Sequence, residues 1–228
     1  MSERDLVAEA YGRGVVHFMG LELAVAPGAL VPRVETELLG QTAIAALLET
    51  GLDAPRVIDM CCGAGNLACA IAHHIAAAHV WAADLTPECV VLTARNVAAC
   101  SLEERVTVRQ GDLFGALEGM GLEGSLDAVV CNPPYISEKR LETERAHLLE
   151  LEPRAAFSAG PYGLSIHMRV VREALPFLKP GGLLLMEVGL GQDRQVKTLF
   201  ERTRSYEDLR VVANEAGEGR VVRGRKAA

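Results

Sequence analysis

Hydrophobic positions along the chain form short, nearly continuous runs that alternate with longer segments of mixed character. The short runs have the length and content of strands; they span 56–60, 79–84, 105–112, 126–132 and 181–189. The segments with helical composition span 65–78, 86–100, 161–178 and 191–203. Two further runs, 209–215 and 220–226, flank "AGEG" and predict a closing hairpin. Strands that alternate with helices and are apolar on both faces predict a mostly parallel sheet with helices on both sides.

Four of the predicted strands end on a polar side chain. Asp59, Asp84 and Asp112 end the first three, and Asn132 ends the fourth. Ligands of parallel sheets bind outside the carboxyl ends of the strands. We therefore expect these four side chains to converge on one crevice, although they are far apart in sequence.

The first strand runs into the glycine-containing turn "DMCCGAGN" (59–66). Gly63 and Gly65 allow positive φ angles and a close approach of the backbone to a ligand. The spacing matches neither a dinucleotide fingerprint nor a P-loop. Asp59 would repel an anion just before the turn but would suit a cation. A nucleoside that carries a cation, such as the sulfonium of S-adenosylmethionine, is the ligand that this turn favours.

The next two strand ends complete the predicted nucleoside site. A carboxylate at Asp84 can accept the hydroxyls of a ribose. Asp112 can accept the amino group of adenine, with Leu113 beside the ring. The predicted cofactor-binding residues are Asp59, Cys61, Gly63, Gly65, Asn66, Asp84, Leu85, Asp112, Leu113 and Asn132.

The fourth strand stops on a rigid loop, "NPPY" (132–135). Prolines donate nothing to a sheet ladder and restrict their own backbone angles. The side-chain oxygen of Asn132 and the carbonyl of Pro133 can accept the N–H bonds of a planar amino group. The rings of Pro134 and Tyr135 can cover its faces. Since the lone pair of an amide nitrogen is delocalised, holding it in line with a methyl group favours transfer, and these four are the predicted catalytic residues.

Composition narrows the classes of function. The chain has 228 residues, of which 50% are hydrophobic, and a net charge of −7. This length fits one large domain, and the acidic balance argues against a uniformly basic nucleic-acid face. No apolar window approaches the roughly 18 residues of a membrane span, and the charged N-terminus lacks the apolar run of a secretory signal. We expect a cytoplasmic protein that binds neither nucleic acid nor membrane.

Cysteine and histidine spacings do not predict a metal site. The cysteines form neither a disulfide framework nor paired C-x-x-C motifs, so we expect reduced, mostly buried thiols. These cysteines are at positions 61, 62, 69, 89, 100 and 131. The histidines, at 17, 73, 74, 79, 147 and 167, show no metal-ligating spacing either.

Several separated motifs together resemble one family. "NPPYI" resembles the loop of many methyltransferases that act on nitrogen. With it stand, in one order, "FMGLELAVAPGALVPRVETELL", "LEPRAAFSAGPYGL", "LKPGGLLLMEVGLGQ" and "NEAGEGRVVRGR". Across about residues 15–226 the chain resembles the catalytic domain of the protein-(glutamine-N5) methyltransferases that modify peptide-chain release factors.

The resemblance implies a fold, a cofactor and a substrate. The implied fold is α/β, the class I S-adenosylmethionine-dependent methyltransferase fold. It is Rossmann-like, with a seven-stranded, mostly parallel sheet whose last strand is antiparallel. S-adenosyl-L-methionine would be the methyl donor, and Asn132 to Tyr135 would hold a glutamine amide. The segment 32–37, "PRVETE", would flank the entrance of the pocket.

Three features depart from the usual pattern of the family. About 14 residues precede the match, so we expect the usual N-terminal helical domain to be lacking. Against the family turn D-x-G-x-G-x-G, we expect Cys61 and Asn66 at the outer glycine positions, and Val34 stands where proline is favoured. We divide the chain into an N-terminal segment with a helix flanking the pocket (1–50) and the methyltransferase domain (51–228).

Four functions remain open from the sequence. The first is N-methylation of a glutamine side chain, with a release factor as partner. The alternative is a small-molecule methyltransferase, acting on an amino acid or natural product, with the same loop. A DNA adenine enzyme is opposed by the acidic balance, and a non-catalytic nucleoside-binding module by the intact Asn132 and both prolines. The charged stretch 137–154 is either a solvated helical face or a lid that contacts substrate.

Overall fold

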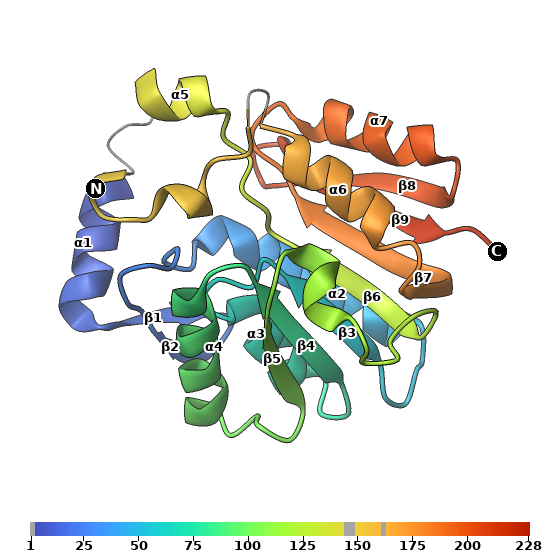
Figure 1. Ribbon diagram of the computed structural model, residues 1–228, viewed down its shortest axis with the longest axis horizontal. Helices are drawn as coiled ribbons and strands as arrows, with labels where there is room; N and C mark the ends of the chain where they lie inside the picture. The colour runs from blue at the N-terminus through green and yellow to red at the C-terminus, as the bar shows by residue number, and fades with distance from the viewer. Residues whose placement is uncertain (1–2, 144–148, 161–162) are drawn as a thin grey trace.

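The computed structural model describes residues 3–143, 149–160 and 163–228 (Figure 1). Its main sheet contains β3 (Arg56–Met60), β4 (His79–Asp84), β5 (Val106–Gln110), β6 (Leu126–Cys131), β7 (Leu178–Glu187), β8 (Tyr206–Ala213) and β9 (Gly219–Lys226). A separate hairpin pairs β1 (Val15–Phe18) with β2 (Leu21–Ala24). The helices are α1 (Glu3–Arg13), α2 (Glu37–Glu49), α3 (Asn66–His74), α4 (Pro87–Ala99), α5 (Glu138–Thr143), α6 (Ser165–Glu173) and α7 (Asp193–Thr203). The short 3-10 helices include η1 (Val34–Thr36), η2 (Leu113–Leu117) and η4 (Arg154–Ala156).

The seven-stranded sheet has the order β5-β4-β3-β6-β7-β9-β8. The pairs from β5 to β7 are parallel, and β9 is antiparallel to both of its neighbours. This arrangement confirms the expected class I methyltransferase fold, including the closing hairpin of β8 and β9. The order reverses between β3 and β6, which places a ligand crevice outside the carboxyl ends of these central strands.

Successive residues of the central strands pack on opposite faces of the sheet, as the two-residue period of a strand requires. Val57 and Val130 lie on the face covered by α2, α3 and α4. Ile58 and Val129 lie on the face covered by α6, α7 and η2. The apolar runs read from the sequence are therefore buried from both sides, which agrees with their lack of polar alternation.

Several elements differ from their expected bounds by a few residues, α6 and β7 among them. The helix expected over 161–178 is α6, which ends at Glu173, and residues 161–162 lie outside the described part of the chain. The strand expected from 181 begins at Leu178 instead. Its pairing with β6 shifts register between Leu126 and Ala128, and this irregularity accommodates Pro180 and the two glycines that follow.

A buried asparagine anchors the N-terminal hairpin to the domain. Asn96 of α4 donates to the carbonyls of Ala24 (3.1 Å) and Ala64 (2.8 Å) and accepts from the Ala24 N–H at 2.8 Å. Since Ala64 belongs to the glycine turn, one side chain joins β2, α4 and that turn. Leu39 and Ala43 of α2 share a core with the sheet, and the division of the chain at residue 50 stays a prediction.

None of the described helices is long and apolar enough to cross a membrane.

Candidate active site

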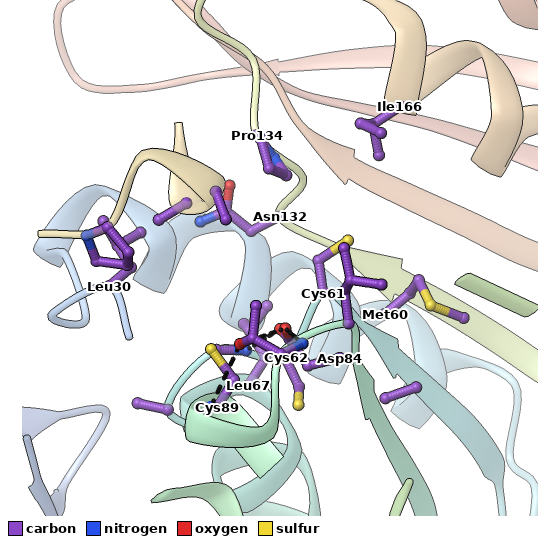
Figure 2. A pocket seen from close by; sticks show the side chains of 18 of the residues that line it. Leu30, Met60, Cys61, Cys62, Leu67, Asp84, Cys89, Asn132, Pro134 and Ile166 are labelled. Atoms are coloured by element: carbon purple, nitrogen blue, oxygen red, sulfur yellow. Dashed lines mark hydrogen bonds between the residues drawn. The ribbon is translucent and has the colours of Figure 1, made fainter. Parts of the chain in front are cut away.

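A cavity of about 240 Å³ opens at the carboxyl ends of β3, β4 and β6 (Figure 2). In Figure 2, Asn132 and Pro134 lie above Asp84 and Cys62 across the hollow. Nine predicted site residues line this first cavity: Cys61, Gly63, Asn66, Asp84, Leu85, Asp112, Leu113, Asn132 and Pro134. Four predicted residues are not part of its lining: Asp59, Gly65, Pro133 and Tyr135. The structure thus brings most of the predicted residues together around one cavity and places the other four outside its lining.

The glycine turn uses three left-handed residues at alternate positions. Cys61, Gly63 and Gly65 have φ angles of 60°, 57° and 76°. Asn66 begins α3 and is not one of them. The expectation that Asn66 stands at an outer glycine position is therefore wrong, because the third left-handed position is Gly65. Cys61 alone departs from glycine in this turn.

Gly63 and Gly65 serve different purposes. A Cβ atom on Gly65 would lie 2.7 Å from Cγ2 of Thr93, so this glycine lets the turn pack against α4. A Cβ atom on Gly63 would meet nothing within 4 Å, and Gly63 lines the cavity. Gly65 is thus a packing residue, whereas Gly63 leaves room for a ligand beside the backbone.

Asp59 is fully buried and does not reach the cavity. Its Oδ2 accepts the Ala68 N–H at 2.9 Å, and its Oδ1 has no hydrogen-bond partner among the described residues. Burial, opposed by the Ala68 N–H and aided by the negative charge of Asp84, raises the pKa of this carboxyl to about 8. Gly65, at the N-cap position of α3, has no side chain to cap the helix. Asp59 satisfies an N–H of its first turn instead, so the expectation of direct cofactor contact is corrected.

Asp84 joins the glycine turn to the start of α4. Its Oδ2 accepts the Gly63 N–H at 2.9 Å, and its Oδ1 accepts the N–H (3.1 Å) and hydroxyl (3.3 Å) of Thr86. Each carboxylate oxygen can accept more than one hydrogen bond, so Asp84 keeps acceptor capacity toward the cavity that it lines.

Asp112 has a partner that the sequence did not indicate. Its two oxygens accept from Nη1 of Arg169 at 2.9 and 3.1 Å. Arg169 lies on α6 and also pairs with Glu173 at 2.8 Å. The carboxylate expected at the adenine edge is therefore also engaged by a side chain of α6. No local sequence signal joins positions 57 residues apart.

A second cavity of about 230 Å³ lies on the other side of Asn132. Asn132 lines both cavities, Pro134 lines only the first, and Pro133 and Tyr135 line only the second. The Tyr135 carbonyl accepts from Nε2 of Gln192 at 3.0 Å, which fixes the loop against the start of α7. The "NPPY" loop therefore forms a partition between two spaces, and Pro134 and Tyr135 do not face the same one.

The second cavity is lined by charged side chains that the sequence analysis did not single out. Glu187, at the end of β7, and Arg220, on β9, are both buried and form an ion pair at 3.5 Å. Burial raises the pKa of Glu187 to about 7, opposed by the Thr36 hydroxyl and by Arg220. Burial also raises the pKa of Tyr135 to about 12, with the charge of Glu187 adding to it. The available signal was a single acid inside the apolar run "LLLMEVG".

The described residues from 149 to 158 form contacts with the "PRVETE" segment and contribute to the walls of both cavities. Glu152 is buried, accepts the Val31 N–H at 2.9 Å and pairs with Arg33 of the "PRVETE" segment. Residues 153–158 contribute to the walls of both cavities, and Arg140 of α5 lines the second. These contacts favour the lid interpretation of 137–154, of which residues 144–148 lie outside the described part of the chain.

The six cysteines are free thiols in the structure. Four of them are buried, which confirms the expectation that most are buried: Cys62, Cys69, Cys89 and Cys131. Burial raises the pKa of the Cys62 and Cys131 thiols well above the usual value, so neither is a reactive thiolate at neutral pH. Among the described residues, no group of three or more histidine, cysteine, aspartate or glutamate side chains could hold a metal ion.

Comparison with known proteins agrees with this geometry. Residues 39–160 match the model of the methyltransferase small domain family. The chain is 34% identical over 210 residues to the release factor glutamine methyltransferase of Moorella thermoacetica, covering 92% of this chain and 72% of that protein. It is 38% identical over 193 residues to the 4-amino-L-phenylalanine/4-methylamino-L-phenylalanine methyltransferase of Streptomyces pristinaespiralis, covering 83% of this chain and 64% of that one.

A solved structure supports the fold. The release-factor-specific protein-(glutamine-N5) methyltransferase of Alicyclobacillus acidocaldarius superposes with a TM-score of 0.52 at 24% identity, covering 90% of this chain and 100% of that one. On the sequence match to the Moorella relative and on the family model, the chain belongs to the release factor glutamine methyltransferase family.

Proposed function

We propose that this protein transfers a methyl group from S-adenosyl-L-methionine to the side-chain amide nitrogen of a glutamine. The observation that carries the proposal is the position of Asn132, which lines both cavities. Its Nδ2 donates to Oγ1 of Thr36 at 3.2 Å, so its Oδ1 is the atom left to accept from a ligand. The Asn132 carboxamide thus lies between the space for the methyl donor and the space for the methyl acceptor.

The first cavity suits the cofactor. The open side of Gly63 accommodates a ligand against the backbone, and Asp84 has acceptor capacity for ribose hydroxyls. Leu85, Leu113 and Ile166 supply apolar surface for a purine ring. The nearby carboxylates favour a cation over a phosphate. Bound there, the cofactor would supply an electrophilic methyl group on a sulfonium.

The residues of the partition would orient the acceptor. Asn132 Oδ1 would accept one N–H bond of the amide, and the rigid backbone of Pro133 would hold the neighbouring carbonyl in place for the other. Held in this way, the amide nitrogen would lie in line with the methyl group that the cofactor would supply. One N–H bond would stay directed away from the partition, so that its proton could leave to solvent on transfer and the sulfur would keep the S–C electron pair.

Two kinds of acceptor fit the second cavity. The relative from Moorella is named for action on release factors, and this favours a protein glutamine. The relative from Streptomyces pristinaespiralis is named for action on an aromatic amino acid, and its 38% identity favours a small molecule with a planar amino group. The charged lining by Glu187 and Arg220 is compatible with the polar backbone of a peptide and with the two charges of a free amino acid. We propose the protein glutamine first.

The test is methyl transfer from labelled S-adenosylmethionine to two substrate pools, purified release factors and a metabolite extract enriched in amino acids. We expect label in the release factors, on glutamine, and none when Asn132→Ala replaces the wild type. Label only in the small-molecule pool would replace the protein substrate by the alternative. Label in neither pool, with the cofactor bound, would contradict the proposed chemistry.

A further inference from the structure

Thr36 is buried at the N-terminus of α2 but does not cap it. It is 2% exposed and occupies the N-cap position, where a threonine hydroxyl ordinarily accepts an N–H of the first turn. Here the side chain makes no such bond. Its Oγ1 instead accepts from Nδ2 of Asn132, 96 positions away, at 3.2 Å. The Thr36 hydroxyl therefore bonds the "NPPY" loop (132–135), called the partition loop below, and not its own helix.

Glu187 has a buried carboxylate oxygen that is free to accept the proton of that hydroxyl. The side chain is 2% exposed, and its Oε2 has no hydrogen-bond partner among the described residues. The nearby Thr36 hydroxyl lowers the pKa of Glu187 against the effect of burial. Arg220 pairs with Oε1 at 3.5 Å and keeps a negative charge favourable there. A hydroxyl has one proton, so a Thr36 that donates to Glu187 can only accept from Asn132.

The direction of this chain decides which end of the Asn132 amide faces the acceptor. If Thr36 accepts, the NH₂ group of Asn132 points to Thr36 and Oδ1 points away from it. If Thr36 instead donated to Asn132, the NH₂ group would face the acceptor. Two NH₂ groups would then meet donor to donor, and the acceptor amide would lose its partner.

We propose that Thr36 and Glu187 are positioning residues that hold the Asn132 carboxamide with Oδ1 toward the acceptor. This inference rests on the proposed function, because it explains how the partition presents an oxygen to an incoming N–H. Neither residue needs to touch the acceptor. Their effect passes through the orientation of Asn132, so it is expected in the rate of transfer and not in cofactor affinity.

The orientation should depend on pH. The groups that face Glu187 are Arg220 from β9, Glu35 from η1, Tyr135 from the partition loop and the ring of His167 from α6, which bonds its backbone carbonyl at 2.9 Å. Ionised Glu187 accepts from Thr36, whereas protonated Glu187 can donate to it. The rate should therefore fall as the pH is lowered through about 7, the pKa to which burial raises this carboxyl.

The experiment compares Thr36→Val, which keeps shape but removes the hydroxyl, with Thr36→Ser, which restores it. Thr42→Val is the matched control, since the Thr42 hydroxyl bonds the Leu38 carbonyl of its own helix at 2.6 Å and lines neither cavity. For whichever acceptor the wild type labels, Thr36→Val should lower kcat about 10²-fold, the effect of a misoriented reacting group. Its cofactor Kd should stay within about twofold of the wild type, which corresponds to less than ~0.5 kcal/mol. Thr36→Ser should recover most of kcat, and Glu187→Gln should abolish the inflection near pH 7.

A second readout needs no acceptor and separates this inference from the proposed function. In ¹⁵N-labelled protein, the side-chain NH₂ signals of Asn132 should shift in Thr36→Val, return in Thr36→Ser and titrate near pH 7 in the wild type. Unshifted signals in Thr36→Val, or full activity of Thr36→Val, would overturn the positioning role. Loss of methyl transfer to any acceptor by the wild type, with the NH₂ titration intact, would overturn only the proposed function.

Discussion

The two cavities that meet at Asn132 are almost equal in size, about 240 and 230 Å³, but they are built in different ways. The first draws its polar groups from the ends of neighbouring parallel strands and the turns that follow them, such as Gly63 and Asp84. The second is assembled from η1, α5, the partition loop and the ends of β7 and β9. It is lined by buried charge, with Glu187 and Arg220 as its centre.

Under the proposed function, the difference follows from what each cavity would recognise, the cofactor in the first and the acceptor in the second. A cofactor common to many enzymes can be held by strand ends, which parallel topology always brings to one edge. An acceptor differs between enzymes, and the second cavity is lined mainly by loops and the ends of elements, where binding residues are commonly found. Buried charges such as Glu187 and Arg220 are costly unless paired, and their position in the proposed acceptor cavity favours a role in selecting the acceptor.

The largest effect is expected where the cavities join. Asn132→Ala removes the acceptor oxygen of the partition and should lower kcat about 10²–10³-fold, the usual loss on deleting one preorganised hydrogen-bonding group. Cofactor binding, measured by calorimetry, should remain close to that of the wild type. An Asn132→Ala enzyme with wild-type turnover would remove the partition from the chemistry.

Substitutions in the first cavity should weaken cofactor binding and not only lower the rate of methyl transfer. Asp84→Ala removes the acceptor of the Gly63 N–H, a charged hydrogen bond worth about 1.5–3 kcal/mol. We expect the cofactor Kd to rise roughly 10–100-fold. Asp53→Ala, at an exposed aspartate before β3, serves as the control and should leave Kd unchanged. An unaltered Kd in Asp84→Ala would exclude Asp84 from the nucleoside site.

The two glycines of the turn should separate binding from stability. Gly65→Ala places a Cβ 2.7 Å from Thr93 at a positive φ, so urea denaturation should show a loss of about 1–3 kcal/mol. Gly63→Ala meets no atom within 4 Å, so it should carry only the strain of its φ, about 1–2 kcal/mol, and weaken cofactor binding instead. Gly217→Ala, also at positive φ with open space around it, is the control for backbone strain alone. Equal losses in all three variants would contradict the division of roles.

A further prediction concerns the pH dependence of stability that the buried carboxyl beneath the turn produces. Asp59 has a folded pKa of about 8, above its ordinary value of 3.8, so the folded state binds more protons than the unfolded chain between these values. The free energy of unfolding should therefore fall as the pH rises from about 4 to 8. Asp59→Asn should make this dependence shallower in urea titrations at pH 5 and pH 8. Asp53→Asn should not change it, and a slope unaltered by Asp59→Asn would refute the raised pKa.

The strand-ending polar residues and the "NPPY" loop could be predicted because each is local. An apolar run that ends on Asp84 or Asn132 predicts a strand with that polar residue at its carboxyl end, which in a parallel sheet is the edge where ligands bind. The sequence placed Asp59 in the cavity, but the burial of its carboxyl depends on how α3 packs after the turn. The pairing of Asp112 with Arg169 could not be predicted either, since it joins positions in contact only through the tertiary fold.

Most of the second cavity could not be predicted from the sequence either, because its residues come together only in the tertiary fold. Thr36 reads as a helix N-cap, and only the structure shows that its hydroxyl leaves the helix for Asn132. Arg220 lies in a run expected simply as a closing strand, yet its guanidinium reaches Glu187 across β7 and β9. Side-chain direction over such distances depends on register, which hydrophobic patterning alone does not specify.

We propose that the Asn132 carboxamide holds the acceptor amide between the two cavities. The most direct measurement is a crystal structure with S-adenosylhomocysteine and a glutamine-containing peptide. The account predicts the glutamine Nε2 within hydrogen-bond distance of Asn132 Oδ1, about 2.7–3.2 Å, facing the cofactor sulfur through the first cavity. A glutamine amide bound elsewhere, or an Asn132 NH₂ group turned toward the acceptor, would contradict it.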